Sequence, residues 1–240
     1  KTFLFPTFEA GFQAMSGMFS IGLRPALIDL AEEVQYPEPD SQTTSHVYMY
    51  IVFEGFMEEI DAQTTRTTKI CIENHADDLG ESPSKDYWDT RHDSAYKYKR
   101  EFLDKSIEDW PTDTWGTNTA YPHVAIPVSK VLDYRRSCEQ IAFSHNIAIT
   151  EYSAWTQPEL FSMMLVDMTL HSDSRNLSKV VDNILELAID QGGSMEYVHG
   201  VGVKLLHILP QELGTGMSVL KGIKTVLDPH NIMNPGKMGL

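Results

Sequence analysis

The chain has 240 residues, of which 42% are hydrophobic and 22% charged, and this is the balance of an ordinary globular protein. Disorder, a collagen-like fibre and a disulfide scaffold are therefore excluded, and a chain of this size can bury a large core without metals or disulfides. Asp and Glu outnumber Lys and Arg by 34 to 19, and no basic stripe is present. Nucleic acid and anionic membrane surfaces are consequently poor partners.

The cysteines, the apolar stretches and the first residues of the chain indicate where in the cell the protein is expected. Cys71 and Cys138 stand far apart and form no CxxC pair, so we expect free buried thiols and a cytoplasmic protein. The apolar stretch 160–170 is interrupted by Asp167 and is shorter than the ~20 residues that a membrane helix needs, so no span is expected. Residues 1–6 include neither an initiator Met nor a signal-peptide pattern, which is typical of a segment that begins partway through a protein.

The first half alternates helix-like and strand-like periods. The spacing of apolar residues predicts, in chain order, a helix over 8–19, a strand over 24–30, a polar loop over 32–45, a buried strand over 47–53, and helices over 58–76 and 85–103. This alternation of helices and strands is similar to, but less regular than, the one predicted for the second half of the chain.

The second half is regular enough to predict a topology. The expected elements are a strand over 114–119, a helix starting at Pro127, strands over 147–155 and 160–170, a helix from an N-cap at 172–174 to Gly192-Gly193, and a strand over 194–198. This β-α-β-β-α-β order is the split βαβ, ferredoxin-like unit. The fold class is therefore α+β, with one antiparallel sheet covered by helices.

The C-terminal region follows as a helix and a tail. Pro210 starts a final amphipathic helix, which Asp228-Pro229 ends, and residues 230–240 form the tail. No linker is long enough to separate independent domains, so the whole of 1–240 is expected to form one domain.

Standard catalytic signatures are absent from the sequence. It contains no GxxxxGK[ST], no GxGxxG after a strand, no GxSxG and no HExxH, which argues against phosphate-loop enzymes, a self-contained Rossmann domain and serine hydrolases. Glu73, His75, Asp77 and Asp78 form an acidic cluster, which we interpret as a solvated helix end rather than a metal site.

The informative stretch is Gly192–Gly202, GGSMEYVHGVG. His199 ends the expected strand and is followed by Gly200 and Gly202, which have no Cβ and so let backbone N–H groups approach a ligand closely. The other interpretation is a tight turn with a half-buried histidine whose hydrogen bonds are satisfied.

This stretch and the closing segment 228–237 (DPHNIMNPGK) resemble the C-terminal cap domain of the FAD-linked oxidases, the vanillyl-alcohol oxidase class of flavoproteins. That family has a GG-S/T strand, an HGxG turn and a DPxNIxNPGK tail. Segments 5–10 (FPTFEA), 22–27 (GLRPAL) and 79–91 (LGESP, then WDTR) are similar to further family motifs. The resemblance covers essentially the whole chain and is nearest to the alkyldihydroxyacetone-phosphate synthase-like branch.

The resemblance implies that the chain is the substrate-binding cap of an FAD-dependent oxidoreductase acting on a small hydroxylated substrate. The domain that binds the FAD diphosphate is absent from this chain, so the implied partners are a flavin-binding domain, in the same or a neighbouring chain, and a small-molecule substrate. FAD is the implied cofactor. The oligomeric state is left open, a homo-oligomer included.

Residue roles are implied in the same way. His199 would face flavin and substrate, Gly200 and Gly202 would allow close approach, and the tail residues Asn231 and Asn234 would lie toward the flavin domain.

For the substrate, Arg100 is the candidate anion anchor, and Arg91 is almost as good, although either arginine could equally form a surface salt bridge. Met163 stands, within a residue or two, where synthases of the nearest branch have a catalytic tyrosine, and methionine cannot transfer a proton. Tyr197 could supply the missing phenol. Because only His199 survives from the branch's three histidines, we expect oxidation of a hydroxyl, or no catalysis, rather than ether-lipid synthesis.

The sister branch of D-lactate and 2-hydroxyglutarate dehydrogenases has GHxGDGNxH on the middle strands and GEHGxG at the turn. This chain has Phe161–Met164 in the strand and Val198 before the histidine, so those metal ligands are missing and no metal is expected. Two alternatives stay open: a synthase-like transferase, and a non-catalytic ferredoxin-like ligand-binding module without a flavin partner.

Overall fold

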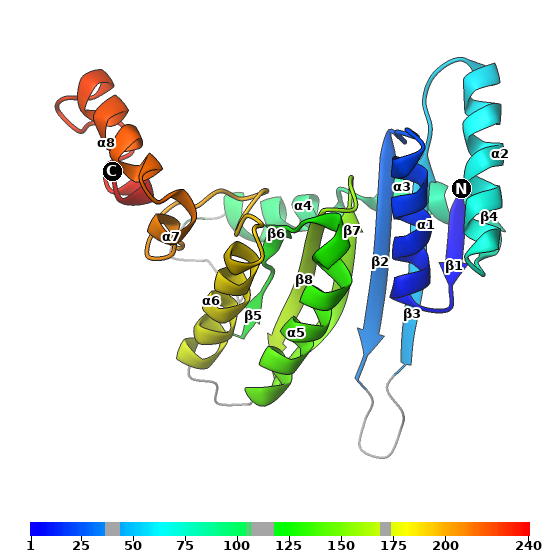
Figure 1. Cartoon of the computed structure of the whole chain (residues 1–240), viewed down its shortest axis with the longest axis horizontal. Helices are drawn as coiled ribbons and strands as arrows, with labels where there is room; N and C mark the ends of the chain where they lie inside the picture. Colours follow the sequence, from blue (N-terminus) through cyan, green and yellow to red (C-terminus); the bar gives the residue numbers. More distant parts are fainter. Residues whose placement is uncertain (37–43, 105, 107–117, 169–173) are drawn as a thin grey trace.

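The computed structural model describes residues 1–36, 44–104, 106, 118–168 and 174–240. Their central feature is an eight-stranded sheet in which every pairing is antiparallel (Figure 1). The strand order is β4-β1-β3-β2-β7-β8-β5, and β6 pairs with β8 beside this path.

The first half contains β1 (Thr2–Phe5), α1 (Phe8–Ser20), β2 (Leu27–Gln35), β3 (Thr44–Val52), α2 (Met57–Glu73), β4 (Asp77–Gly80), α3 (Ser82–Thr90), α4 (Asp93–Tyr98) and the π-helical turn η1 (Lys99–Leu103). The second half contains β5 (Thr119–Ala120), β6 (His123–Ala125), the 3₁₀ turn η3 (Val128–Lys130), α5 (Val131–Ser144), β7 (Ile147–Trp155), β8 (Leu160–Asp167), α6 (Ser174–Asp190), α7 (Leu209–Leu213), α8 (Gly216–Leu227) and the 3₁₀ turn η4 (Lys237–Gly239).

Two units of the same topology share this sheet. In the first, β1-α1-β2-β3-α2-β4 gives the strand order β4-β1-β3-β2. In the second, β6-α5-β7-β8-α6 is followed by Ser194, which bridges Ala125 of β6, so the order is Ser194-β6-β8-β7. The predicted α+β class and the ferredoxin-like second half are confirmed, and the first half adopts the same arrangement.

The two units join along β2 and β7, which pair from Asp29 opposite Trp155 to Glu33 opposite Glu151. Figure 1 shows α1, α5 and α6 on one side of the joined sheet and α3 and α4 on the other. The side covered by α1, α5 and α6, here called the helix-covered side, holds the core. Alternate strand residues are fully buried there, among them Leu30, Met49 and Phe161.

Helix α1 illustrates how the sequence builds this core. The Thr7 hydroxyl accepts a hydrogen bond from the backbone N of Ala10 at 3.2 Å and caps the helix. Phe8 then packs its ring 6.0 Å from that of Phe161 on β8, and Tyr134 of α5 packs on the same ring at 6.0 Å. One helix from each unit therefore contacts the same strand residue.

Arg135 of α5 fastens the junction between the units. Its guanidinium lies 4.7 Å from the ring centre of Phe8 and 4.1 Å from that of Tyr152. Its Nη1 lies 2.8 Å from Oε2 of Glu32 on β2, and its Nε lies 3.0 Å from Oε1 of Glu139. The Arg135 and Glu32 side chains are 11% and 9% exposed, so this ion pair is buried between the two units.

Two of the predicted boundaries in the first half are wrong. The loop expected over 32–45 is occupied at both ends by strand, because β2 continues to Gln35 and β3 begins at Thr44. Glu32 faces the core and pairs with Arg135, so a carboxylate stands where the strand pattern calls for an apolar residue. The helix expected over 85–103 is divided into α3, α4 and η1.

The strand predicted over 194–198 is also wrong, since only Ser194 forms a bridge. The carboxylate of Glu212 on α7 accepts hydrogen bonds from the Ser194 hydroxyl and from the backbone N of Met195, both at 2.8 Å. A side chain thus takes the place of a strand partner. Most of the strand expected over 114–119 lies outside the described residues, and β6 serves as the first strand of the second unit.

Glycines set two chain reversals. Gly193 packs so closely that a Cβ there would lie 2.2 Å from the carbonyl oxygen of Ala125, and Gly192 ends α6 with a φ of 81°. Gly214, with a φ of 51°, divides the predicted final helix into α7 and α8. Figure 1 shows α8 extending away from the sheet, and it buries no residue.

Both cysteines are buried and free. In the described part of the chain, no helix combines the length and apolar character needed to cross a membrane. The cytoplasmic location stays a prediction.

We expect Arg135→Ala to lower the free energy of unfolding by about 3–5 kcal/mol, because it leaves the buried Glu32 carboxylate without its partner. Arg136→Ala is the matched control: the neighbouring Arg136 pairs with Asp133 and is 57% exposed, so its loss should cost under about 1 kcal/mol. Urea unfolding of both variants checks this. Equal losses in the two variants would show that Arg135 does not fasten the junction.

Candidate functional site

The sheet face opposite the core is lined with polar and aromatic side chains. Strand alternation places these residues there: Asp29, Glu33, Tyr48, Tyr50, His123, Glu151, Ser153 and Ser162. Ser162 stands opposite both His123 and Ser153, and Glu151 stands opposite Met164. Titratable groups from both units therefore share one surface.

One cluster on this face surrounds Asp29 at the junction. Its carboxylate accepts hydrogen bonds from the Tyr87 hydroxyl of α3 at 2.8 Å and from the Ser153 hydroxyl at 3.0 Å. The Tyr87 ring stacks on that of Tyr50, with the ring centres 4.4 Å apart. Burial raises the pKa of Asp29 and outweighs these hydrogen bonds, which act in the opposite direction.

A second pair lies on the second unit. The Tyr121 hydroxyl donates to Oε1 of Glu151 at 2.5 Å, and the Tyr121 ring lies 4.4 Å from that of His123. Burial, and after it the hydrogen bond to Glu151, raises the pKa of Tyr121 well above its ordinary value. The phenol therefore stays protonated and can donate a hydrogen bond.

The HGVG segment forms a turn rather than the end of a strand. Oε1 of Glu196 accepts hydrogen bonds from the backbone N of Val198 at 2.6 Å and of His199 at 2.9 Å. Gly200 and Gly202 follow with φ of 72° and 55°, a region that favours glycine. The carboxylate folds the chain back so that the His199 side chain, 62% exposed, projects from the turn.

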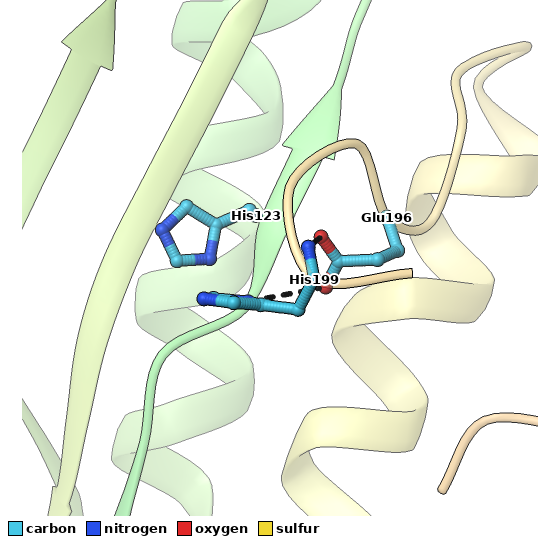
Figure 2. A group of neighbouring side chains, drawn as sticks. All are labelled: His123, Glu196 and His199. Atoms are coloured by element: carbon cyan, nitrogen blue, oxygen red, sulfur yellow. Dashed lines mark hydrogen bonds and ion pairs between the residues drawn. The ribbon is translucent and has the colours of Figure 1, made fainter. Parts of the chain in front are cut away.

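His199 meets His123 and Glu196 at this point (Figure 2). The two imidazole rings lie 4.7 Å apart at 77°, and Nδ1 of His199 lies 3.8 Å from Oε2 of Glu196. His123 is only 7% exposed, and its Nδ1 is buried with no hydrogen-bond partner among the described residues. Burial, and secondarily the nearby His199, lowers the pKa of His123, which favours the neutral imidazole.

Tyr197 lies beside the same group, with its ring 5.9 Å from that of His123. Its hydroxyl is buried and also has no hydrogen-bond partner within the described structure. Burial raises the pKa of Tyr197 to about 12.

Tyr121, Glu151, Glu196 and His199 line a cavity of about 1030 Å³ between the sheet face, α6 and the turn. Its walls are formed by Thr119, Ala120, Tyr121, Pro122, Glu151, Met164, Val181, Leu185, Glu196, His199, Gly200, Lys204 and Leu205. A mostly apolar enclosure with a few convergent polar groups is typical of a small-molecule site.

The C-terminal motif builds a second turn that reaches the first. The Asp228 carboxylate accepts hydrogen bonds from the backbone N of Ile232 and Met233, both at 2.9 Å, and pairs with Lys224. Met238 then donates its backbone N to the carbonyl of Gly202 at 2.9 Å. The two motifs that carried the family resemblance are therefore in contact.

The predicted site residues separate into two groups. His199 and Gly200 line the cavity, Tyr197 lies beside His123, and Gly202 contacts the tail. In the tail, Asn231 and Asn234 are exposed and adopt φ of 49° and 48°.

The predicted substrate contacts lie elsewhere. Met163 is fully buried in the core on the helix-covered side, and its neighbour Met164 lines the cavity instead. Arg91 stacks on Trp88 at 3.6 Å, and Arg100 is exposed in η1. Neither arginine is among the described residues that line the cavity.

Sequence reasoning missed Tyr121, His123 and Glu151 on the sheet side of the site and Glu196 of the turn. A weak signal was available for two of them: Tyr121 and His123 alternate with Val124 and Ile126 in a short run near Pro122 and Pro127, as a half-buried strand would. Their proximity to the turn depends on tertiary structure.

The family comparison matches residues 2–238 to the FAD linked oxidases, C-terminal domain. The chain belongs to this family.

Curated relatives include the glycolate oxidase subunit GlcD of Bacillus subtilis, 21% identical over 98% of this chain and 49% of its own length. A probable mitochondrial D-lactate dehydrogenase of Danio rerio is 23% identical over 79% of this chain and 37% of its length. The chain thus spans half or less of these relatives.

Solved structures share the fold. An alkyldihydroxyacetonephosphate synthase matches with a TM-score of 0.62 at 17% identity, over 98% of this chain and 44% of that one. The 4-ethylphenol oxidase of Gulosibacter chungangensis matches with a TM-score of 0.59 at 13% identity, over 99% and 53%.

We expect Asp29→Asn to become progressively more stable than the unsubstituted chain as the pH rises from about 4 to 7. Because the pKa of Asp29 is raised in the folded state, the protonated form favours folding, and that contribution is lost as the carboxyl ionises. Urea unfolding at several pH values measures the difference. Asp89→Asn, at an exposed position on the same helix as Tyr87, is the control for removing a carboxylate outside the cluster. Equal pH dependence in both variants would contradict the assignment.

Proposed function

We propose that this chain is the substrate-binding cap of an FAD-dependent oxidoreductase that oxidises the hydroxyl group of a small substrate. The observation that carries the proposal is the cavity in which the HGVG turn, through Glu196 and His199, meets Tyr121 and Glu151 of the sheet. Family membership supports the flavin, and the names of the curated relatives support a small hydroxy acid.

The residues present fit a flavin that approaches from outside the chain. Gly200 and Gly202 are exposed, with nothing near the position of a Cβ, so their backbone is open to a planar ring. The buried Tyr197 hydroxyl and His123 Nδ1, which have no partner in the described structure, supply polar atoms in the same region. FAD, when held by its own domain, supplies the two-electron acceptor.

The chain's own groups then position the substrate and manage the proton. His199, exposed at the cavity and near Glu196, accepts the proton of the substrate hydroxyl as a general base. The Tyr121 hydroxyl donates its one hydrogen to Glu151, so its oxygen accepts a hydrogen bond from a second hydroxyl group of the substrate. Met164, Val181 and Leu185 exclude water from the carbon skeleton.

The C-terminal helix supports a docked flavin domain. Helix α8 buries none of its residues and exposes Val219, Ile223, Val226 and Leu227. A surface of this kind is typical of a contact with another domain. Asn231 and Asn234 come a few residues after α8 and are exposed, which supports their proposed orientation toward the flavin domain.

Hydroxyl oxidation accounts for the cavity better than ether-lipid synthesis. The strand position at the cavity carries Met164, which cannot transfer a proton, and His199 is the sole histidine of the Tyr197-Val198-His199 run.

In an assembly of this chain with its flavin-binding domain, we expect His199→Ala to lower the rate of flavin reduction by 2-hydroxy acids by about 10²- to 10⁴-fold, the usual contribution of a general base. Because the side chain is exposed, the free energy of unfolding should change by under about 0.5 kcal/mol. His207→Ala, a surface histidine 53% exposed and paired with Asp182, should change neither quantity. Anaerobic bleaching of the flavin absorbance gives the rate.

Two results would contradict the proposal. One is normal turnover by His199→Ala together with a large loss of stability, which would assign the histidine a structural role. The other is formation of an alkyl ether from acyl dihydroxyacetone phosphate and a fatty alcohol at ordinary enzymatic rates.

We also expect the 240-residue chain, purified alone, to be colourless. Its sequence has no glycine-rich diphosphate loop and no basic cluster to hold the phosphates of FAD. Absorption spectroscopy after incubation with excess FAD and gel filtration provides the measurement, and a yellow protein with one flavin per chain would contradict the assignment of FAD binding to a separate domain.

A further inference from the structure

We propose that Lys204 determines the specificity of the cavity by binding the carboxylate of an acidic substrate. Lys204 lines the cavity together with His199, the proposed general base. This inference rests on the proposed function and deepens it, because it names the residue that distinguishes a 2-hydroxy acid from a neutral alcohol.

The charge of the chain makes a local cation necessary for such a substrate. Acidic residues outnumber basic ones by 34 to 19, and the resulting net charge of −15 repels small anions. Lys204 is the only lysine or arginine among the described residues that line the cavity. Arg91 and Arg100, the anchors expected from the sequence, are not among those residues, so Lys204 is the cation available to a bound anion.

The ammonium group of Lys204 has no partner that competes with a ligand. Within the described part of the chain, it forms neither an ion pair nor a hydrogen bond. Both carboxylates of the cavity wall are engaged by other groups. Oε1 of Glu151 accepts from the Tyr121 hydroxyl, and Oε1 of Glu196 accepts from two backbone N–H groups of the turn. A substrate carboxylate therefore meets a free ammonium, and charge-assisted hydrogen bonds are roughly twice as strong as neutral ones.

The backbone holds Lys204 beside the turn that carries His199. The backbone N of Leu205 donates to the carbonyl of Val201 at 3.2 Å, which closes a further turn over residues 201–205. The Leu205 side chain is 7% exposed and forms part of the cavity wall, so it anchors this turn. A 2-hydroxy acid has its hydroxyl and carboxylate on neighbouring carbons. One short segment that supplies both the base and the cation suits that arrangement.

The chemistry of lysine fits a carboxylate in this cavity. An ammonium is a compact charge with three donors on a flexible stem, so it pairs with a carboxylate without requiring planar alignment. Met164, Val181 and Leu185 of the wall are apolar and carry no charge for the substrate. A neutral alcohol therefore gains no attraction from Lys204, whereas a hydroxy acid does.

The test uses the chain assembled with its flavin-binding domain. Anaerobic flavin reduction is measured with a 2-hydroxy acid and with the uncharged 1,2-diol of the same carbon skeleton. We expect Lys204→Met to raise the half-saturating concentration of the acid about 10- to 100-fold, the usual effect of losing a hydrogen bond to a charged group. The reaction of the diol should not change, and Lys204→Arg, which keeps the charge, should retain most of the affinity for the acid.

Lys179→Met is the matched control. Lys179 is exposed on α6 and is not among the described residues that line the cavity, so its loss should leave the half-saturating concentration of the acid unchanged. Raising the ionic strength should weaken binding of the acid to the unsubstituted protein more than to Lys204→Met, because salt screens an attraction between full charges. Circular dichroism confirms that each variant is folded.

Oxalate separates this inference from the proposed function, because it is a dicarboxylate without a hydroxyl group to oxidise. Its affinity, measured by isothermal titration, should fall about 10- to 100-fold in Lys204→Met and stay unchanged in Lys179→Met. If oxalate binding depends on Lys204 while no hydroxy compound reduces the flavin, the anion site stands and the proposed oxidation is wrong. Unchanged affinity for the acid and for oxalate in Lys204→Met would overturn the inference. So would an equal loss with the diol, or the same loss in Lys179→Met.

Discussion

The pairing of β2 with β7 is the constraint on which the rest of the molecule depends. Each βαββαβ unit alone would leave a strand edge unpaired, and the pairing from Asp29 to Glu33 closes both edges in one sheet. The buried ion pair between Arg135 and Glu32 stabilises the same line from the core side. Because the sheet is continuous, every strand residue is assigned to one of two faces.

One face of the sheet stabilises the fold, and the other carries the titratable side chains. The face beneath α1, α5 and α6 is mostly apolar, with the Arg135–Glu32 pair buried at the junction, and it supplies the hydrophobic core. The opposite face carries carboxylates, phenols and an imidazole, and at its far end the HGVG turn closes over it. Partly buried titratable groups concentrated on one side of a sheet are typical of a functional surface. The apolar face thus stabilises the fold. The groups proposed to act on the substrate lie on the opposite face of the second unit, beneath the turn.

The sequence predicted the elements whose periodicity is undisturbed by function. The helix over 8–19 and the strand over 147–155 were found because their apolar residues recur at regular spacing. The end of β2 was predicted wrongly because Glu32, a charged residue, faces the core there. Its position in the core is understandable only from its ion pair with Arg135, which the sequence does not reveal. For the site, the glycines identified His199, but His123 sits on a three-residue strand whose partners are remote in sequence. Such proximity is a tertiary property that no local pattern contains.

The central claim is that the HGVG turn and the polar sheet face together form the substrate half of a flavoenzyme site. The most direct measurement is a structure of this chain assembled with its flavin-binding domain and a non-oxidisable 2-hydroxy acid analogue. The account predicts the flavin ring against Gly200 and Gly202, with the ligand in the cavity between His199 and Tyr121. A flavin located away from this turn, or a cavity filled by a segment of the other domain, would contradict it.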